Sequence, residues 1–415
     1  MGRLMSVAAS ADGEATLAGL RAEGFVRPDA GRNRTPPIDC STVVSDSDLN
    51  QSSTDPTVPV ATEHGAAPVR IGLNTFGDVP SDGNGDLLSH AEALRQVVAE
   101  AVLADRSGVD DFLVGEHHRA DYAISAPETV LAGIATRTER IRLGSGVTVL
   151  SSDDPVRVFQ RFATLDALSH GRAEVILGRG SFTESFPLFG YDLADYETLF
   201  EEKIDLFSQL LTEEPVTWQG NKRASLTDAD VYPKTESGKL ETWVGVGGSP
   251  QSVVRAAHYR FPLMLAIIGG GARRFAPYID LFQRATEQFG GPSLPVGVHS
   301  PGFVAETDEQ AREILWPYHQ QQRDLIGRDR GWPPMQRAEF ESEIAHGSLY
   351  VGSPETVATK IADTISALGI DRFDMVYTSG AIPAADRLRA VELYGTEVIP
   401  RVRELLAEKS AADKS

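Results

Sequence analysis

Cysteine is almost absent from this chain. Among its 415 residues there is a single cysteine, Cys40. One thiol cannot form an intramolecular disulfide, and it cannot supply a cysteine-based metal cluster. The composition therefore predicts a protein of the reducing cytoplasm.

Positive charge is also scarce. The chain carries 39 Lys and Arg residues against 59 Asp and Glu residues, which gives a formal net charge of −20. Such a chain repels nucleic acid and anionic lipid surfaces. No uninterrupted apolar run is long enough to span a bilayer, and the first residues lack the continuous apolar segment of a secretion signal. We therefore predict neither a nucleic-acid partner nor a membrane partner.

Common cofactor and metal signatures are missing as well. The chain has no Rossmann G-x-G-x-x-G fingerprint with a downstream acid, no Walker A lysine motif and no H-E-x-x-H zinc motif. A small anionic cofactor can still bind where basic side chains or helix N-termini reverse the local field. We predict no metal site.

The first part of the chain differs from the rest. Residues 1–67 are rich in Ser, Thr, Asp and Pro and show no sustained period of 2 or 3.6. This composition predicts a disordered, low-complexity extension. A translation start assigned too early is the alternative, because an ordered chain begins near Val69. We place one folded domain at 68–408 and a disordered tail at 409–415.

From Val69 onward, candidate strands alternate with candidate helices. The expected strands lie at 69–76, 109–118, 141–150, 172–180, 241–248, 262–268, 294–305 and 373–380. The expected helices lie at 87–107, 126–138, 155–169, 195–211, 249–259, 275–289, 306–325, 354–368 and 384–405, with a β-hairpin insertion at 218–233. This alternation predicts an α/β protein with a parallel sheet, namely a (β/α)8 TIM barrel with insertions. A doubly wound open sheet is the alternative.

Polar side chains follow the second expected strand. Because catalytic groups of a TIM barrel lie at the C-terminal ends of its strands, each strand exit is a candidate site. The second strand ends in Gly115-Glu116-His117-His118. These residues can be a solvated loop, two or three metal ligands, or a histidine placed for proton transfer with a carboxylate beside it.

Glycine marks three further strand exits. Gly144-Ser145-Gly146-Val147 indicates either a bulge or the close approach of a ligand. In Gly178-Arg179-Gly180-Ser181, the arginine suits a phosphate, although an exposed turn is the alternative. In the segment from Gly245 through Gly248 to Ser252, Ser249 is a good N-cap and Pro250 fits the first helical position. Such a turn can hold a phosphate on its free N–H groups, or it can simply cap a helix.

These motifs together resemble the bacterial luciferase-like monooxygenases, the luciferase-like class of flavin-dependent oxidoreductases. The resemblance rests on FLVGEHH, on the long segment from IRLGSGVTVL to GRAEVILGRG, on SFPLFG and on VGSPETVATKI. It extends from Val69 to about Leu405 and does not include the N-terminal extension.

The resemblance implies a TIM barrel that uses reduced FMN and usually forms a homodimer. It places His117 on the catalytic histidine, with Glu116 beside it, and Arg179 on the arginine that binds the flavin phosphate. Ser249 and Ser252 fall on phosphate-binding hydroxyl residues, next to Gly248, and Gly180 and Ser181 follow the arginine. The Gly146–Val147 peptide falls on a non-proline cis bond beside the flavin ring.

The implied reaction is oxygenation of a small organic substrate by O2 through a flavin C4a-hydroperoxide, with the reduced flavin delivered by a separate reductase. Two features depart from the family pattern. Gly178 stands where luciferase has a reactive cysteine, and residues 325–347, where the family has a mobile lid, match too loosely for any residue to be transferred. Three alternatives remain: an F420-dependent oxidoreductase on the same fold, a non-catalytic flavin-binding partner subunit and a metal-dependent hydrolase.

Overall fold

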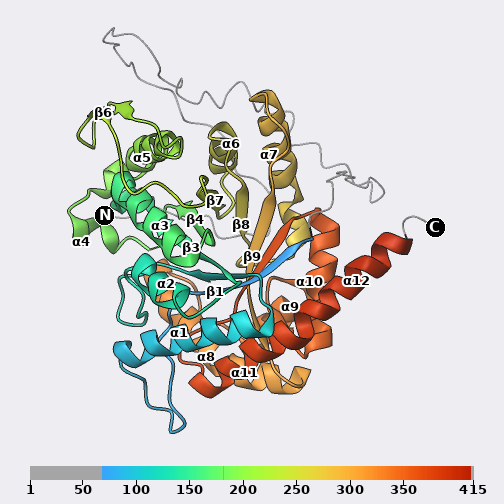
Figure 1. Cartoon of the computed structure of the whole chain (residues 1–415). Coiled ribbons are helices and arrows are strands. Elements are labelled where there is room, and N and C mark those ends of the chain that lie inside the picture. The colour runs from blue at the N-terminus through green and yellow to red at the C-terminus, as the bar shows by residue number, and fades with distance from the viewer. Residues whose placement is uncertain (1–67, 181, 413–415) are drawn as a thin grey trace. The chain divides into compact units, whose positions relative to one another are not determined.

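A computed structural model describes residues 68–180 and 182–412 of the chain (Figure 1). Within these residues, eight strands form a closed ring in which every neighbouring pair is parallel. The first strand lies beside the last, and β8 pairs with β9, so the ring has no open edge. The predicted TIM barrel is therefore confirmed, and the doubly wound open sheet is wrong.

The strands of the ring, in spatial order, are β1 (Arg70–Thr75), β2 (Asp111–Val114), β3 (Arg142–Val149), β4 (Ala173–Gly178), β7 (Glu241–Val246), β8 (Leu263–Ala266), β9 (Val296–Val304) and β11 (Arg372–Val376). The helices are α1 (His90–Ser107), α2 (Pro127–Ala135), α3 (Pro155–Ser169), α4 (Ser185–Phe189), α5 (Tyr196–Leu210), α6 (Pro250–His258), α7 (Ala276–Gln288), α8 (Asp308–Arg330), α9 (Arg337–His346), α10 (Pro354–Leu368), α11 (Ala384–Leu393) and α12 (Ile399–Ala412). Short 3-10 segments lie at Leu150–Ser152, Leu193–Asp195 and Ala272–Phe275, and a π turn at Tyr394–Val398 joins α11 to α12.

Local sequence signals explain why the helices begin and end where they do. Helix α3 is the clearest case, because its bounds equal the predicted 155–169. The Asp154 carboxylate accepts hydrogen bonds from the backbone N–H groups of Val156 and Arg157 at 3.0 and 3.2 Å, and Pro155 occupies the first turn. The helix ends at His170, whose φ of 56° is left-handed.

The structure adds elements that the sequence pattern did not predict. Helix α8 continues to Arg330 instead of ending near 325, and α9 lies inside the segment compared with the family's lid. A short strand, β10 (Tyr350–Gly352), pairs with β9 outside the ring. The predicted hairpin insertion is present as β5 (Val216–Trp218) and β6 (Leu226–Ala229).

The two ends of the chain bear on the predicted domain boundaries. The extension at 1–67 and residues 413–415 lie outside the described residues. Helix α12 continues to Ala412, four residues beyond the predicted boundary at 408, and Lys409 Nζ lies 2.6 Å from the Asp363 carboxylate of α10. Residues 409–412 are therefore helical, whereas the sequence predicted a disordered tail from 409. In the part of the chain that is described, no helix is both long and apolar enough to cross a bilayer.

A network of buried charges fills the barrel near the N-terminal ends of its strands. Arg372 Nη2 lies 2.7 Å from the Glu174 carboxylate, and Arg372 Nε lies 2.8 Å from that of Asp374. Arg70 bonds to Glu174 from the other side, at 2.6 Å, and also to Asp111. The side chains of Arg372, Glu174, Asp111 and Asp374 are all 0% exposed. In a TIM barrel this end is associated with stability, which leaves the opposite end for ligands.

Candidate active site

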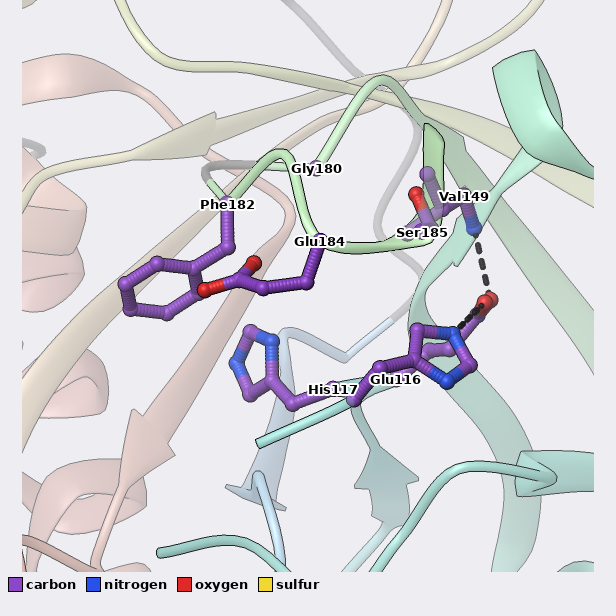
Figure 2. A pocket seen from close by; sticks show the side chains of 8 residues that line it. Glu116, His117, Val149, Gly180, Phe182, Glu184 and Ser185 are labelled. Carbon is purple, nitrogen blue, oxygen red and sulfur yellow. Dashed lines mark hydrogen bonds and ion pairs between the residues drawn. The ribbon is translucent and has the colours of Figure 1, made fainter. Parts of the chain in front are cut away.

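The predicted site residues gather at the C-terminal ends of β2, β3, β4 and β7. A small pocket opens beside the exit of β2, and Figure 2 shows the His117 ring pointing toward Phe182 and Glu184 on the facing loop. Its lining residues are Glu116, His117, His118, Val149, Gly180, Phe182, Glu184 and Ser185. The predicted Glu116, His117 and Gly180 thus meet in one place, while Ser181 lies outside the described residues.

His117 lies among aromatic rings. Its ring centroid is 4.4 Å from that of Tyr122 and 5.0 Å from those of Phe76 and Phe182. Removal of the imidazole from water, together with the nearby positive charge of Arg119, lowers the pKa of His117 to about 3. The imidazole is therefore neutral at physiological pH and offers one N–H donor and one lone pair.

Glu116 joins two strands instead of contacting the His117 ring. One carboxylate oxygen lies 2.9 Å from His118 Nε2, and the other accepts a hydrogen bond from the backbone N–H of Val149 at 3.0 Å (Figure 2). The carboxylate thereby ties the exit of β2 to the end of β3. In the described structure no hydrogen bond joins the Glu116 carboxylate to His117, so the predicted assistance of His117 by Glu116 stays a prediction.

A second cluster lies where β4 and α6 meet. Arg179 Nη2 donates to Ser252 Oγ at 3.0 Å, and its guanidinium lies 5.1 Å from the centroid of the Tyr196 ring. Arg255, which the sequence analysis did not single out, reaches the same hydroxyl from Nη1 at 3.5 Å. Glu197 bonds to Arg179 with one carboxylate oxygen and lies 3.3 Å from Arg255 Nη2 with the other.

This cluster, which we call the anion clamp (Arg179, Arg255, Ser252 and Ser249), has the chemistry of a phosphate site. Both guanidiniums already converge on one anionic group, the Glu197 carboxylate, whose side chain is 63% exposed and can leave without disturbing the core. Oxygen anions of phosphate accept the same charge-assisted hydrogen bonds. The clamp therefore fits the phosphate end of a flavin nucleotide.

The turn between β7 and α6 completes the clamp. Ser249 is the N-cap of α6, and its hydroxyl accepts a hydrogen bond from the backbone N–H of Ser252 at 3.4 Å. A Cβ added at Gly247 would meet no atom within 4 Å, and Gly248 has a φ of 109°, which favours glycine. Open backbone at a helix N-terminus lets an anion approach the N–H groups closely.

The glycines around β3 have a different role. The Gly146–Val147 peptide bond is cis, as predicted, and the β3–β4 register shifts between Gly146 and Thr148 as in a bulge. A Cβ at Gly178 would lie 2.5 Å from Val147 Cγ2, and one at Gly245 would lie 2.9 Å from Val147 Cγ1. Gly178 and Gly245 thus make room for the Val147 side chain.

The chain matches a known protein family over most of its length. The model of the luciferase-like monooxygenase family matches residues 70–372. The chain belongs to this family. Among the described residues of this luciferase-like protein, no three His, Cys, Asp or Glu side chains are grouped so that they could hold a metal ion.

Individual relatives differ in the cofactor that their names give. The chain is 42% identical to the 4-hydroxyprotoasukamycin monooxygenase of Streptomyces nodosus subsp. asukaensis over 315 residues, which cover 72% of the chain and 84% of that protein. It is 23% identical to the F420-dependent glucose-6-phosphate dehydrogenase of Amycolatopsis mediterranei over 339 residues, 75% of the chain and 95% of that protein. The oxygenating constituent of 3,6-diketocamphane monooxygenase from Pseudomonas putida, solved with FMN, has the same fold, with a TM-score of 0.65 at 20% identity over 81% of the chain and 99% of that structure.

Sequence reasoning missed several residues of this luciferase-like site. Arg255 and Glu197 lie in ordinary amphipathic helices, so no local motif distinguishes them from surface charges. Phe76 and Tyr122 contact His117 from outside the four strand exits considered above. Gly77, which follows Phe76 and has a φ of 73°, is a signal that could have indicated the first of them. His299 faces the same side of β9 as Gly297 and Pro301, and this alternation with a period of two could have indicated an inward position.

The contact between Gly178 and Val147 leads to a test of packing. We expect Gly178→Ala to lower the free energy of unfolding by about 1–3 kcal/mol, because the added methyl overlaps Val147 in a filled space. Gly247→Ala is the matched control and is expected to change it by less than about 0.5 kcal/mol. Urea denaturation measures both, and equal losses in the two variants would contradict this assignment. The Gly178→Ala, Val147→Gly double variant is expected to lose less free energy of unfolding than the sum of the losses in the two single variants.

Proposed function

We propose that this protein is a flavin-dependent monooxygenase that uses reduced FMN and O2 to oxygenate a small organic substrate. The observation that carries the proposal is the anion clamp, in which Arg179, Arg255 and Ser252 converge at the end of β4. Gly180, which follows Arg179, lines the same pocket as His117, so a cofactor whose phosphate the clamp held would lie beside that pocket. The 42% identity to a monooxygenase supports oxygenation over other reactions of the family.

Phosphate binding, exclusion of water and proton transfer would be carried out by residues at different positions of the barrel. The anion clamp would bind the phosphate of the flavin and so limit where the flavin ring can lie. Reduced flavin, when bound, supplies the electrons that activate O2. The rings of Phe76, Tyr122 and Phe182 keep bulk water from the His117 imidazole. His117, being neutral, can accept or donate one proton at its ring nitrogens as the oxygen transfer proceeds.

Replacement of His117 tests this division. We expect His117→Ala to lower O2-dependent turnover about 10²- to 10⁴-fold, because general acid–base catalysis contributes that range. FMN affinity is expected to stay within about threefold, because the clamp is untouched. Since the pKa of His117 is about 3, its protonation state is constant from pH 6 to pH 9. Any rise or fall of the native rate with pH in this range should therefore persist in a His117→Gln variant.

Three outcomes would point elsewhere. Tight binding of F420 with no binding of reduced FMN, measured anaerobically by fluorescence, would replace the proposal by F420-dependent hydride transfer. Unchanged turnover in His117→Ala would remove the assigned role. FMN binding without any O2-dependent product, across a panel of organic substrates, would favour a non-catalytic partner subunit.

The partners that we propose follow from this scheme. They are O2, a small organic substrate, a separate flavin reductase in the cytoplasm and a second copy of the chain in a homodimer. The reductase is included because the sequence shows neither of the nucleotide-binding fingerprints sought above. Sedimentation of the full chain checks the dimer, and a coupled assay with a reductase and NAD(P)H checks the supply of reduced flavin.

A further inference from the structure

A second histidine lies on the inner wall of the barrel. His299 is in β9, and its Nδ1 lies 2.9 Å from the Nδ2 of Asn74 in β1. β1 and β9 are not neighbours in the ring, because β11 lies between them. The contact therefore crosses the interior of the barrel.

The hydrogen bonds of Asn74 determine which nitrogen of His299 carries the proton. The Asn74 Nδ2 also donates to the carbonyl oxygen of Gly146, at 3.4 Å. Because a carbonyl can only accept, the amide nitrogen must face this side, and its second N–H points to His299 Nδ1. Nδ1 is thus an acceptor, and the proton of the neutral ring lies on Nε2.

The surroundings keep the His299 ring neutral, and the residue is not fully buried. Burial, with the charge of Arg372 adding to the effect, lowers the pKa of His299 to about 4. His299 is nevertheless not fully buried, and the same holds for its register partner Ala266 and for Phe76, Val147 and Gly245 on other strands. These four are apolar, so His299 adds a polar group to the floor of the mouth.

His299 and His117 share a neighbour. The Phe76 ring centroid lies 5.0 Å from that of His117 and 6.0 Å from that of His299. The two imidazoles therefore flank one phenyl ring at the mouth. A flat ligand lying over this floor would meet His117 at one side and His299 at another.

We propose that His299 binds the cofactor ring: its Nε2–H donates a hydrogen bond to a carbonyl or ring-nitrogen acceptor of the flavin, with Asn74 fixing the tautomer. This inference rests on the proposed function. A reduced flavin ring carries negative charge, and a fixed N–H donor in a dry site stabilises charge that an apolar floor would not. His299 therefore favours the reduced over the oxidised cofactor.

Affinity for the two redox states of FMN tests the inference. We expect His299→Leu to bind reduced FMN about tenfold or more weakly, and oxidised FMN only about twofold more weakly, since hydrogen bonds to charged groups are the stronger ones. His299→Gln, which keeps an N–H donor, should recover most of the reduced-FMN affinity. Equal losses for both redox states in His299→Leu would indicate a packing role only and would overturn the inference.

A measurement on the native protein keeps the test independent of any folding defect. Selective 15N labelling of histidine identifies the His299 signals by their absence in His299→Gln. We expect the proton on Nε2 without ligand and a changed Nε2–H resonance after addition of reduced FMN. A proton on Nδ1, or a His299 resonance that does not change while FMN binds, would overturn the inference and leave the proposed function standing. If the native chain bound no reduced FMN, the proposed function would fail first and the inference with it.

Discussion

The Arg179→Ala variant is expected to bind reduced FMN about 10- to 100-fold more weakly than the native chain. The guanidinium supplies a charge-assisted donor at the centre of the anion clamp, and such hydrogen bonds contribute about 1.5–3 kcal/mol. Affinity for reduced riboflavin, which lacks the phosphate, should stay within about twofold. Anaerobic fluorescence titration of both ligands gives the comparison, and equal losses for the two would contradict a phosphate role for Arg179.

Glu197 provides the matched control. In the described structure its carboxylate bonds to Arg179 and lies 3.3 Å from Arg255 Nη2, so it competes with an incoming phosphate for the same donors. We expect Glu197→Gln to bind reduced FMN a few times more tightly, on the scale of an exposed ion pair. The Glu197→Gln variant should unfold at nearly the native denaturant concentration, because the Glu197 side chain is mostly exposed.

The largest expected effect on stability lies at the other end of the barrel. Replacing Arg372 by Met leaves the carboxylates of Glu174 and Asp374 buried without their shared partner. Breaking a buried ion pair in this way costs about 3–5 kcal/mol, because the remaining charge keeps its desolvation cost and loses its attraction. The midpoint and slope of urea denaturation measure the loss.

Two further variants separate this explanation from a loss of packing. Arg142→Met removes a guanidinium that is 30% exposed, pairs with the equally exposed Glu241 and lies 3.6 Å from the Glu174 carboxylate, so it is expected to cost clearly less than Arg372→Met. Glu174→Gln combined with Arg372→Met should lose less stability than the sum of the single variants, because both members of one buried ion pair are then removed. Strict additivity would show that the Arg372–Glu174 pair at 2.7 Å is not coupled.

Most of the barrel could be predicted because its signals are local. Capping by Asp154 and Pro155 sets the start of α3, and runs of apolar residues mark the buried strands. The missed elements have weak local patterns. Helix α9 buries only Phe340 and Ile344, which is one short stripe, and β10 has three residues, too few for a period of two to be visible.

The candidate site was predictable only where glycine or a cap marks it. Arg179, Ser249 and Ser252 follow recognisable strand exits, and the structure brings Arg179 to Ser252. Arg255 contacts Glu197, and Asn74 contacts His299; these residues are far apart in the sequence, and no local pattern encodes such contacts. The roles of Gly178 and Gly245 could not be predicted from the sequence either. Both positions lack a side chain because the Val147 side chain occupies that space, not because a ligand approaches there.

The division of the barrel into two ends has a consequence for how such a protein can change over generations. The buried charge network occupies one end of the strands, and the residues that would meet a ligand occupy the other. Effects of substitutions at well-separated positions add, so a substitution at the loop end leaves the contribution of the buried charge network to the free energy of folding unchanged. A laboratory library restricted to the loops after β2 and β4 and to the α8–α9 connection can therefore explore new substrates while most of its members still fold.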